Sequence, residues 1–115
     1  MRYSRNCRLL KRSDFDAVFK SVTSPQLGRL IRQRNYLVYQ RFSEQSPRLG
    51  LSISKKAVRL AARRNRLKRC LRDFFRQHLA ELRGDIIVRW TTDPNSYEYD
   101  DLTKPLSLLI QRSVS

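Results

Sequence analysis

The densest group of chemically capable side chains in this sequence is a run of cations between Lys55 and Arg76. The run holds ten Lys and Arg residues and a single acid, Asp73. A guanidinium presents a planar fork of donors that matches a phosphate, and an ammonium attracts phosphate as a point charge. Like charges one helical turn apart repel by about 0.2–0.5 kcal/mol per pair. So dense a set of cations therefore favours an anionic partner over a merely solvated helix face.

The excess of positive charge lies in the first two thirds of the chain. The 115 residues carry 25 Lys and Arg against 10 Asp and Glu, a formal charge of +15. Residues 1–80 account for +17 of this charge and residues 81–115 for −2. Arg outnumbers Lys by 19 to 6, and Arg also stacks on bases. We therefore expect one polyanion-binding face, built from residues 1–80.

Aromatic residues supply the second chemical signal. Phe15 and Phe19 are four residues apart on a predicted helix, and Tyr36 and Tyr39 lie on opposite faces of a predicted strand. Each residue alone is consistent with a place in the core or at its edge. Together they suggest an aromatic-lined groove, in which each stacked base contributes roughly 1–3 kcal/mol. Single-stranded RNA is therefore favoured over double-stranded DNA.

Groups for catalysis by the protein's own side chains are missing from the sequence. The one histidine, His78, lies on the apolar side of the main predicted helix, where a satisfied core-edge role is expected. Cys7 and Cys70 are too few for a zinc site, and Cys70 is expected to be a small buried residue. The acids are scattered, so we expect no catalytic residue and no metal site. No apolar run approaches the roughly 20 residues that span a bilayer. An amphipathic helix lying on a membrane would need an exposed apolar face, but the apolar face of the main predicted helix is needed to cover the predicted sheet.

The elements that must position these groups follow from periodicity and turn signals. Residues 1–12 are expected to form a basic N-terminal arm, and Ser13 with Asp16 resembles a capping box for the first helix. The expected elements are a helix over 14–22, strands over 28–34, 36–42 and 49–54, a main helix over 57–83, a strand over 85–90 and a helix over 99–112, in which Pro105 kinks or delays the helix. This order, α-β-β-β-α-β-α, predicts an α+β sandwich that forms a single RNA-binding domain over residues 1–115.

The main predicted helix separates its side chains by type. At 100° per residue one side gathers apolar residues and His78: Leu67, Leu71, Phe74, His78 and Leu82, with Phe75 beside them. The opposite side is polar and basic: Asn65, Arg69, Arg72 and Arg76, flanked by Arg66 and Lys68. Arg64 leans toward the apolar flank, so we expect its side chain to reach past the sheet edge. Gly84 is expected to end the helix. The strand over 49–54 alternates large apolar residues with Gly50, Ser52 and Ser54, so one of its faces carries only small side chains.

Two segments of this sequence together resemble a known family. Residues 48–56 read Arg-Leu-Gly-Leu-Ser-Ile-Ser-Lys-Lys, and seven residues later 64–76 read Arg-Asn-Arg-Leu-Lys-Arg-Cys-Leu-Arg-Asp-Phe-Phe-Arg. This pattern is similar to the protein subunit of bacterial ribonuclease P. Residues 8–9, residues 15–19 and Tyr39 also fit, so the likeness spans roughly 8–112. The sequence departs from the family in a long, basic stretch between Ser24 and Tyr36, in Asp73, where the family often has Glu, and in Pro105.

The resemblance implies that an RNA subunit carries out the catalysis and that the protein assists it. In that family a catalytic RNA removes the 5′ leader of precursor tRNA with Mg²⁺ bound mainly by RNA, so the protein is the subunit of an endoribonuclease and holds no catalytic residue. It implies ribonuclease P RNA and precursor tRNA as partners, and no required protein partner. It also implies an uncommon left-handed β-α-β crossover between the third strand and the main helix. Independently of the resemblance, the charged N-terminus lacks the apolar stretch of a secretory signal, so no membrane association and a cytoplasmic location are expected.

The resemblance also assigns residues by matching position. A leader cleft between the first helix and the sheet would be lined by Phe15, Phe19 and Tyr39. The predicted RNA-binding residues are Lys55, Lys56, Arg64, Asn65, Arg66, Lys68, Arg69, Arg72 and Arg76. On geometry alone, Arg69 and Arg72 rank above Arg64.

Two other function classes remain open at this point. A ribosomal or ribosome-associated RNA-binding protein would share the basic helix but would need no groove for a single strand. A stand-alone nuclease would cleave RNA with a metal ion and without an RNA subunit. Restoring cleavage of precursor tRNA by a bacterial catalytic RNA would distinguish the ribonuclease P interpretation from both.

Overall fold

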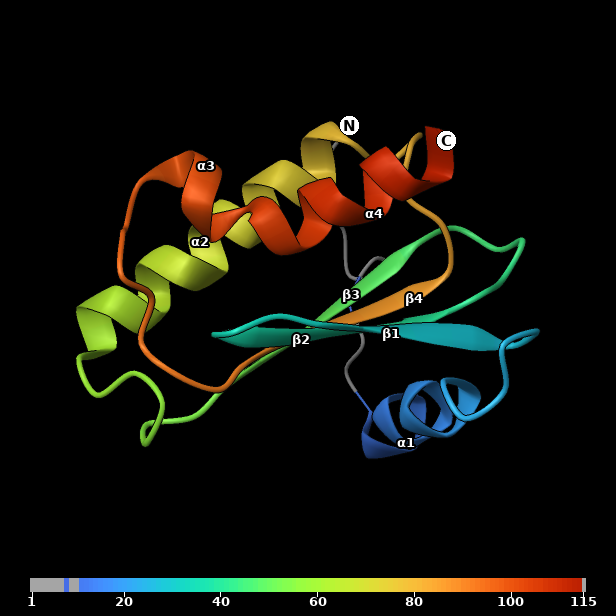
Figure 1. The fold of residues 1–115 in the computed structure, drawn as a ribbon, viewed down its shortest axis with the longest axis horizontal. Coiled ribbons are helices and arrows are strands. Elements are labelled where there is room, and N and C mark those ends of the chain that lie inside the picture. Colours follow the sequence, from blue (N-terminus) through green and yellow to red (C-terminus); the bar gives the residue numbers. More distant parts are fainter. Residues whose placement is uncertain (1–7, 9–10, 115) are drawn as a thin grey trace.

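A computed structural model describes residue 8 and residues 11–114 of the chain. Eight elements follow in order: α1 (Arg12–Ser21), β1 (Gly28–Arg32), β2 (Tyr36–Arg41), β3 (Arg48–Ile53), α2 (Ala61–Gln77), β4 (Asp85–Trp90), α3 (Tyr99–Leu102) and α4 (Lys104–Val114). Figure 1 shows α1 alone on one face of the sheet, with α2, α3 and α4 on the other. The predicted α+β architecture is confirmed, except that the last predicted helix is two helices.

The four strands form one sheet in the order β1-β2-β4-β3. Neighbouring strands are antiparallel in the β1–β2 and β2–β4 pairs, whereas β3 and β4 are parallel. Parallel neighbours cannot be joined by a tight hairpin, so the chain crosses over one face of the sheet as α2 between them. The predicted β-α-β crossover is therefore present, and its handedness stays a prediction of the resemblance.

The main core lies between the sheet and the layer of α2 and α4. Leu67, Leu71 and Phe75 of α2 are fully buried, as the helical period predicts. They pack against alternate strand residues such as Val38 and Val88, which are also fully buried. Each such side chain contributes about 1.5–3 kcal/mol through burial. The apolar side of α2 is thus occupied by the sheet, and its basic side is left to face outward.

A smaller cluster holds α1 against the opposite face of the sheet. Val18 of α1 and Ile87 of β4 are fully buried there, with Phe15, Phe19 and Tyr39 half-buried around them. Gly28 allows the end of α1 to approach the sheet closely. A Cβ at residue 28 would lie 2.5 Å from the Gln40 carbonyl oxygen and 2.6 Å from Ser21 Oγ. The pairing of α1 with the sheet thus depends on a few contacts rather than on a large core.

The first helix begins earlier than the capping residues predict. Lys11 is the N-cap and makes no side-chain capping bond, and its carbonyl oxygen accepts from the amides of Asp14 and Phe15. Ser13 therefore lies inside the first turn, and the predicted capping box with Asp16 is wrong. The predicted arm over residues 1–12 lies mostly outside the described residues, as does Cys7. Of the arm's described residues, Arg8 forms a parallel bridge with Leu49 of β3, and Arg12 already belongs to α1.

The second helix is shorter at both ends than residues 57–83. Residues 55–57 form a turn instead, in which Ser54 Oγ accepts from the Ala57 amide at 3.1 Å. At the other end, the His78 amide bonds to the carbonyls of Phe74 and Phe75, and turns follow. Gly84 therefore does not end the helix. Its φ is 74°, and a Cβ at residue 84 would collide with the Arg41 carbonyl oxygen, so this place at the start of β4 requires glycine.

The tail is divided in the way that Pro105 predicts. Thr103 separates α3 from α4, and its Oγ1 donates to the Tyr99 carbonyl at 2.8 Å. Pro105 is the second residue of α4, where a missing amide proton breaks no intrahelical bond. Leu102, Leu106 and Leu109 are buried against the main core, so one side of this segment packs on the sheet layer.

Candidate nucleic-acid interface

The outer face of α2 carries a basic stripe. We use the name outer stripe for Asn65, Arg69, Arg72 and Arg76, all of which are exposed. They recur at helical spacing opposite the buried residues of the same helix, so the predicted separation of faces is confirmed. Lys68 is half-buried beside them, and Arg66 is exposed.

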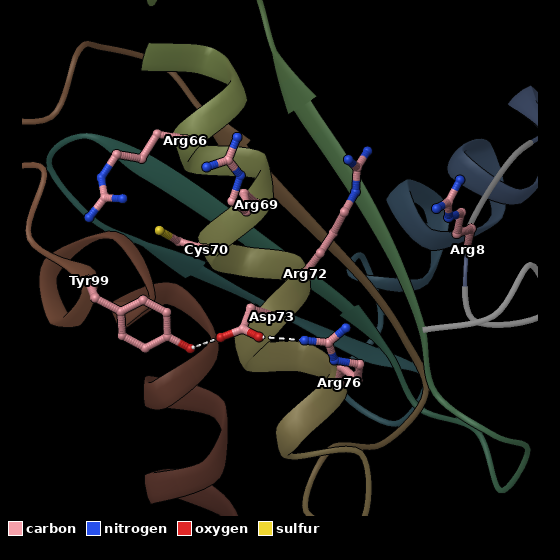
Figure 2. A pocket seen from close by; sticks show the side chains of 8 residues that line it. All are labelled: Arg8, Arg66, Arg69, Cys70, Arg72, Asp73, Arg76 and Tyr99. Carbon is pink, nitrogen blue, oxygen red and sulfur yellow. Dashed lines mark hydrogen bonds and ion pairs between the residues drawn. The ribbon is translucent and has the colours of Figure 1, made fainter. Parts of the chain in front are cut away.

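A shallow hollow of about 810 Å³ lies beside the outer stripe (Figure 2). Its lining is rich in guanidinium groups: Arg8, Arg66, Arg69, Cys70, Arg72, Asp73, Arg76 and Tyr99. Asp73 is the acid of this lining. Its carboxylate accepts from Arg76 Nη2 at 2.7 Å, from Gln77 Nε2 at 3.0 Å and from the Tyr99 hydroxyl at 2.9 Å. Burial of Tyr99 and its bond to Asp73 together raise the pKa of Tyr99 to about 12.

Arg69 and Arg72 have no side-chain partner in the part of the chain that the structure describes. Neither residue forms an ion pair or a hydrogen bond through its side chain with another described residue. Figure 2 shows both guanidinium groups pointing away from the Asp73 carboxylate, whereas Arg76 points toward it. These two residues are therefore charged donors that remain available to an anion, and Arg76 is partly neutralised.

The arginines near the start of α2 have internal partners. Arg64 Nη1 donates to the carbonyls of Val58 and Arg59, at 2.8 and 2.9 Å. The expectation that Arg64 reaches past the sheet edge is therefore wrong. Its side chain folds back onto the loop before its own helix, because unpaired carbonyls there lie within reach. Arg66 Nε donates to the Tyr97 carbonyl at 3.1 Å.

Arg63 is also engaged, by the loop between β4 and α3. It pairs with Asp93 at 3.2 Å, and its guanidinium carbon lies 5.2 Å from the centre of the Tyr97 ring. Tyr97 in turn donates its hydroxyl proton to Asp93. Burial and this bond raise the pKa of Tyr97 to about 12. These contacts thus hold the start of α2 against residues 93–97.

The other face of the sheet holds an aromatic groove. The Phe15 and Phe19 rings are 6.4 Å apart between centroids, and Phe19 meets Tyr39 edge-on at 4.8 Å. A groove of about 630 Å³ opens beside Phe19, and its remaining lining is Ser52, Ser54, Lys56, Ala57, Arg89, Trp90 and Thr91. The small side chains of β3 that the alternation predicted leave room for this groove. The structure therefore brings the three predicted aromatic residues into one cluster, and Phe19 is the one of the three that lines the groove.

Two residues of this region differ from the expectation. Tyr36 does not belong to the groove: it is 7% exposed in the main core, with its ring 4.9 Å from that of Trp90, and burial raises its pKa. Arg89 lines the groove and was missed by the sequence reasoning. The available signal was its parity with Ile87 in the strand over 85–90, which places both residues on one face.

The predicted basic residues consequently lie on two faces of the molecule. Lys55 and Lys56 are exposed in the turn after β3, and Lys56 lines the groove. The outer stripe lies on α2, across the sheet from α1 (Figure 1). The predicted basic residues therefore form two surfaces, although they follow one another in a single run of the sequence.

The remaining polar groups offer little acid–base chemistry. His78 stacks on Phe74 with 4.1 Å between ring centroids and contacts Glu81 at 2.7 Å, which is the expected core-edge role. Cys70 is a free, buried thiol, as expected. In the part of the chain that the structure describes, no three His, Cys, Asp or Glu residues are grouped to hold a metal ion. Over the same part, no helix has both the length and the apolar character to cross a membrane.

Comparisons with known proteins point to one family. A family model described as ribonuclease P matches residues 3–114. The "Ribonuclease P protein component" of Stutzerimonas stutzeri is 44% identical over 88 residues, which cover 75% of this chain and 63% of that protein. The protein of the same name from Pseudomonas savastanoi pv. phaseolicola is 46% identical and 62% covered. The match thus spans slightly under two thirds of the length of these relatives.

Solved structures agree with the sequence matches. The RNase P protein of Staphylococcus aureus superposes with a TM-score of 0.73 at 27% identity, covering 93% of this chain and 94% of that one. The RNase P protein of Thermotoga maritima, solved in complex with 1-(4-fluorophenyl)-2-thiourea, superposes with a TM-score of 0.69 at 27% identity, covering 91% of this chain and 98% of that one.

Proposed function

This chain belongs to the ribonuclease P family, and from that premise we propose that it is the protein component of a ribonuclease P holoenzyme. It would bind the catalytic RNA and the 5′ leader of precursor tRNA, and so promote endonucleolytic maturation of the tRNA 5′ end. In this proposal residues 1–115 act as one RNA-binding domain in the cytoplasm, where a free thiol such as Cys70 stays reduced.

The observation that carries this proposal is the presence of two distinct surfaces suited to RNA on opposite faces of one sheet. The outer stripe offers the guanidinium groups of Arg69 and Arg72, which have no side-chain partner among the described residues and suit the phosphates of a folded RNA. The groove beside Phe19 offers the Phe19 ring, a lysine and an arginine, which suits the bases and phosphates of a single strand. A protein that must bring two RNA molecules together needs two such surfaces.

The catalytic centre in this proposal lies in RNA. Three acids of this chain are engaged with other side chains: Asp73 with Arg76 and Tyr99, Asp85 with Arg48, and Asp93 with Arg63. Among the described residues, no three His, Cys, Asp or Glu side chains are grouped to hold a metal ion. In this proposal Mg²⁺ is bound mainly by the catalytic RNA. The protein would contribute positioning and charge neutralisation. Arg69 and Arg72 would lower the repulsion between two polyanions, and Phe19 and Tyr39 would hold the leader.

The test is reconstitution with a bacterial catalytic RNA and a precursor tRNA. The purified chain should restore cleavage at the 5′ end at low Mg²⁺, and failure to do so would overturn the proposal. Binding should also weaken steeply with salt. For about six to ten phosphate contacts the affinity should fall roughly 10³–10⁵-fold between 50 and 200 mM salt. A salt-insensitive interaction would contradict a phosphate-binding surface.

A matched pair of variants tests the groove. Phe19→Ala should weaken binding of leader-bearing precursor tRNA by roughly 1–3 kcal/mol and leave binding of mature tRNA unchanged, since one stacked base is lost. Phe42→Ala, at an aromatic residue that is 43% exposed and outside the groove, should change neither. Because Phe19 also packs against Tyr39, Phe19→Leu is a second variant that retains apolar volume but removes the ring. Equal losses for both tRNAs would remove Phe19 from the leader site.

A further inference from the structure

The register of the sheet places two arginines in one row on the face that α1 covers only in part. Arg32 of β1 pairs with Leu37 of β2, Leu37 pairs with Arg89 of β4, and Arg89 pairs with Ser52 of β3. Directly paired residues point to the same face of a sheet. Because Arg89 is two residues from Ile87, which packs against Val18 of α1, the whole row faces the α1 side. We call these four residues the open row.

At the opposite end of the same sheet face, a comparable row contains arginines that are paired with acids. There Arg41, Asp85 and Arg48 are paired across β2, β4 and β3. Arg48 Nε and Nη2 donate to the two carboxylate oxygens of Asp85, each at 2.8 Å. Asp14 of α1 lies 3.7 Å from Arg48, and Arg41 lies 4.0 Å from Asp85. The bond to Asp85 raises the pKa of Arg48. Each arginine of this row is therefore held by an acid.

The open row has the same residue type and no acid. Arg32 and Arg89 are exposed, and neither forms an ion pair or side-chain hydrogen bond with another described residue. Arg34, in the turn that follows β1, is likewise exposed and unpaired within the described chain. Two strand spacings separate Arg32 from Arg89, about 10 Å. Leu37 lies between them and is only half-buried. Two cations thus flank an accessible apolar side chain.

This pattern continues the groove and matches the chemistry of a single strand. Arg89 and Ser52 belong both to the open row and to the groove lining beside Phe19. A single strand that leaves the groove at Arg89 can cross Leu37, where a base or sugar meets an apolar surface, and reach Arg32 and Arg34. A duplex would present phosphates without exposed base faces and would leave Leu37 unused.

We propose that the open row and Arg34 extend the leader site, so that Arg89, Arg32 and Arg34 bind phosphates of leader nucleotides upstream of those held in the groove. This inference rests on the proposed function, because it assumes that the groove holds the leader. It also accounts for the long, basic stretch between Ser24 and Tyr36, which folds into β1 and the turn leading to β2. That hairpin provides an additional basic strand at the sheet edge.

The experiment compares two precursor tRNAs in the reconstituted holoenzyme, one with a leader that ends in the groove and one with a leader several nucleotides longer. The variants are Arg32→Ala with Arg34→Ala, and Arg89→Ala. The control is Arg83→Ala, an exposed arginine that lies outside the groove and the open row. Circular dichroism checks that the exposed substitutions leave the fold intact.

The double variant should lose about tenfold in affinity for the long leader and nothing for the short one. For the long leader, the slope of log affinity against log salt concentration should fall in magnitude by about 1.4, which is the value for two phosphate contacts on a single strand. Arg89→Ala should weaken both substrates, because Arg89 also lines the groove, and Arg83→Ala should match the wild type. The inference is overturned if the double variant binds the long leader as tightly as the wild type does. It is also overturned if the double variant loses the same affinity for the short leader as for the long one. If the wild-type chain does not support cleavage at all, the proposed function fails instead.

Discussion

The arginines at the start of α2 and those in its middle have the same chemistry and different surroundings. At the start of the helix, Arg63, Arg64 and Arg66 each contact a loop through an acid, an aromatic ring or a backbone carbonyl. In the middle of the helix, Arg69 and Arg72 contact no acid or carbonyl among the described residues. The first group joins parts of the protein together, and the second group is left charged and accessible.

The helix dipole explains why Arg63 and Arg64, in or next to the first turn, need partners. The start of an α-helix carries a partial positive charge, so cations in the first turn are unfavourable there. The first turn of α2 contains no acid, and its N-cap, Leu60, makes no side-chain capping bond. The carbonyls of Val58 and Arg59 and the carboxylate of Asp93 offset this charge. A basic motif therefore contains residues that build the surface as well as residues that bind through it.

The largest expected effect tests the second group. The double substitution Arg69→Ala with Arg72→Ala should lower the affinity for catalytic RNA roughly tenfold per residue, since a charge-assisted hydrogen bond contributes about 1.5–3 kcal/mol. The slope of log affinity against log salt should fall by about 2 in magnitude, one unit for each phosphate contact. Fluorescence anisotropy over a salt series measures both quantities. An unchanged slope would show that these arginines do not contact phosphate.

A smaller effect tests the first group. Arg64→Ala removes two hydrogen bonds to the loop before α2, and we expect the free energy of unfolding to fall by about 1 kcal/mol. That loss corresponds to a decrease in Tm of about 4 °C for a domain of this size. Arg69→Ala is the matched control, because it removes a side chain without an internal partner, and its Tm should equal that of the wild type. If the two variants had the same Tm, the proposed difference between the two groups would be wrong.

The smallest effect concerns the network around Asp73, between the outer stripe and α3. The folded-state pKa of Tyr99 is raised from 10.0 to about 12, so folding favours the neutral phenol. The stabilisation by this hydroxyl is complete below about pH 10 and is lost as the pH rises toward 12. Tyr99→Phe lacks the bond to Asp73 at every pH. The difference in unfolding free energy between wild type and variant, measured by urea titration, should therefore shrink between pH 10 and 12. A constant difference would contradict the raised pKa.

Local patterns predicted much of this molecule. The spacing of Leu67, Leu71 and Phe75 placed the buried and basic sides of α2 correctly, because a helix repeats every 3.6 residues whatever it packs against. The strand over 85–90 was predicted with its observed bounds, since a short run of branched residues bounded by Gly84 and Thr91 has few other conformations. The helix ends were less accurate. The capping box at Ser13 failed, because α1 begins at Arg12 and Ser13 is already helical.

The sequence by itself determined the residue types, the faces of each element and the charge that must be neutralised, since these depend on the residue and on its near neighbours along the chain. Tertiary structure alone decided which arginines received partners from distant parts of the chain. Asp85 lies beside Arg48 across 37 residues, and the Tyr97 carbonyl accepts from Arg66 across 31. It also decided that Arg32 and Arg89, far apart in the chain, share one row of the sheet. Pairing between distant residues depends on strand register and on helix placement, which are properties of the whole packed fold rather than of any single segment.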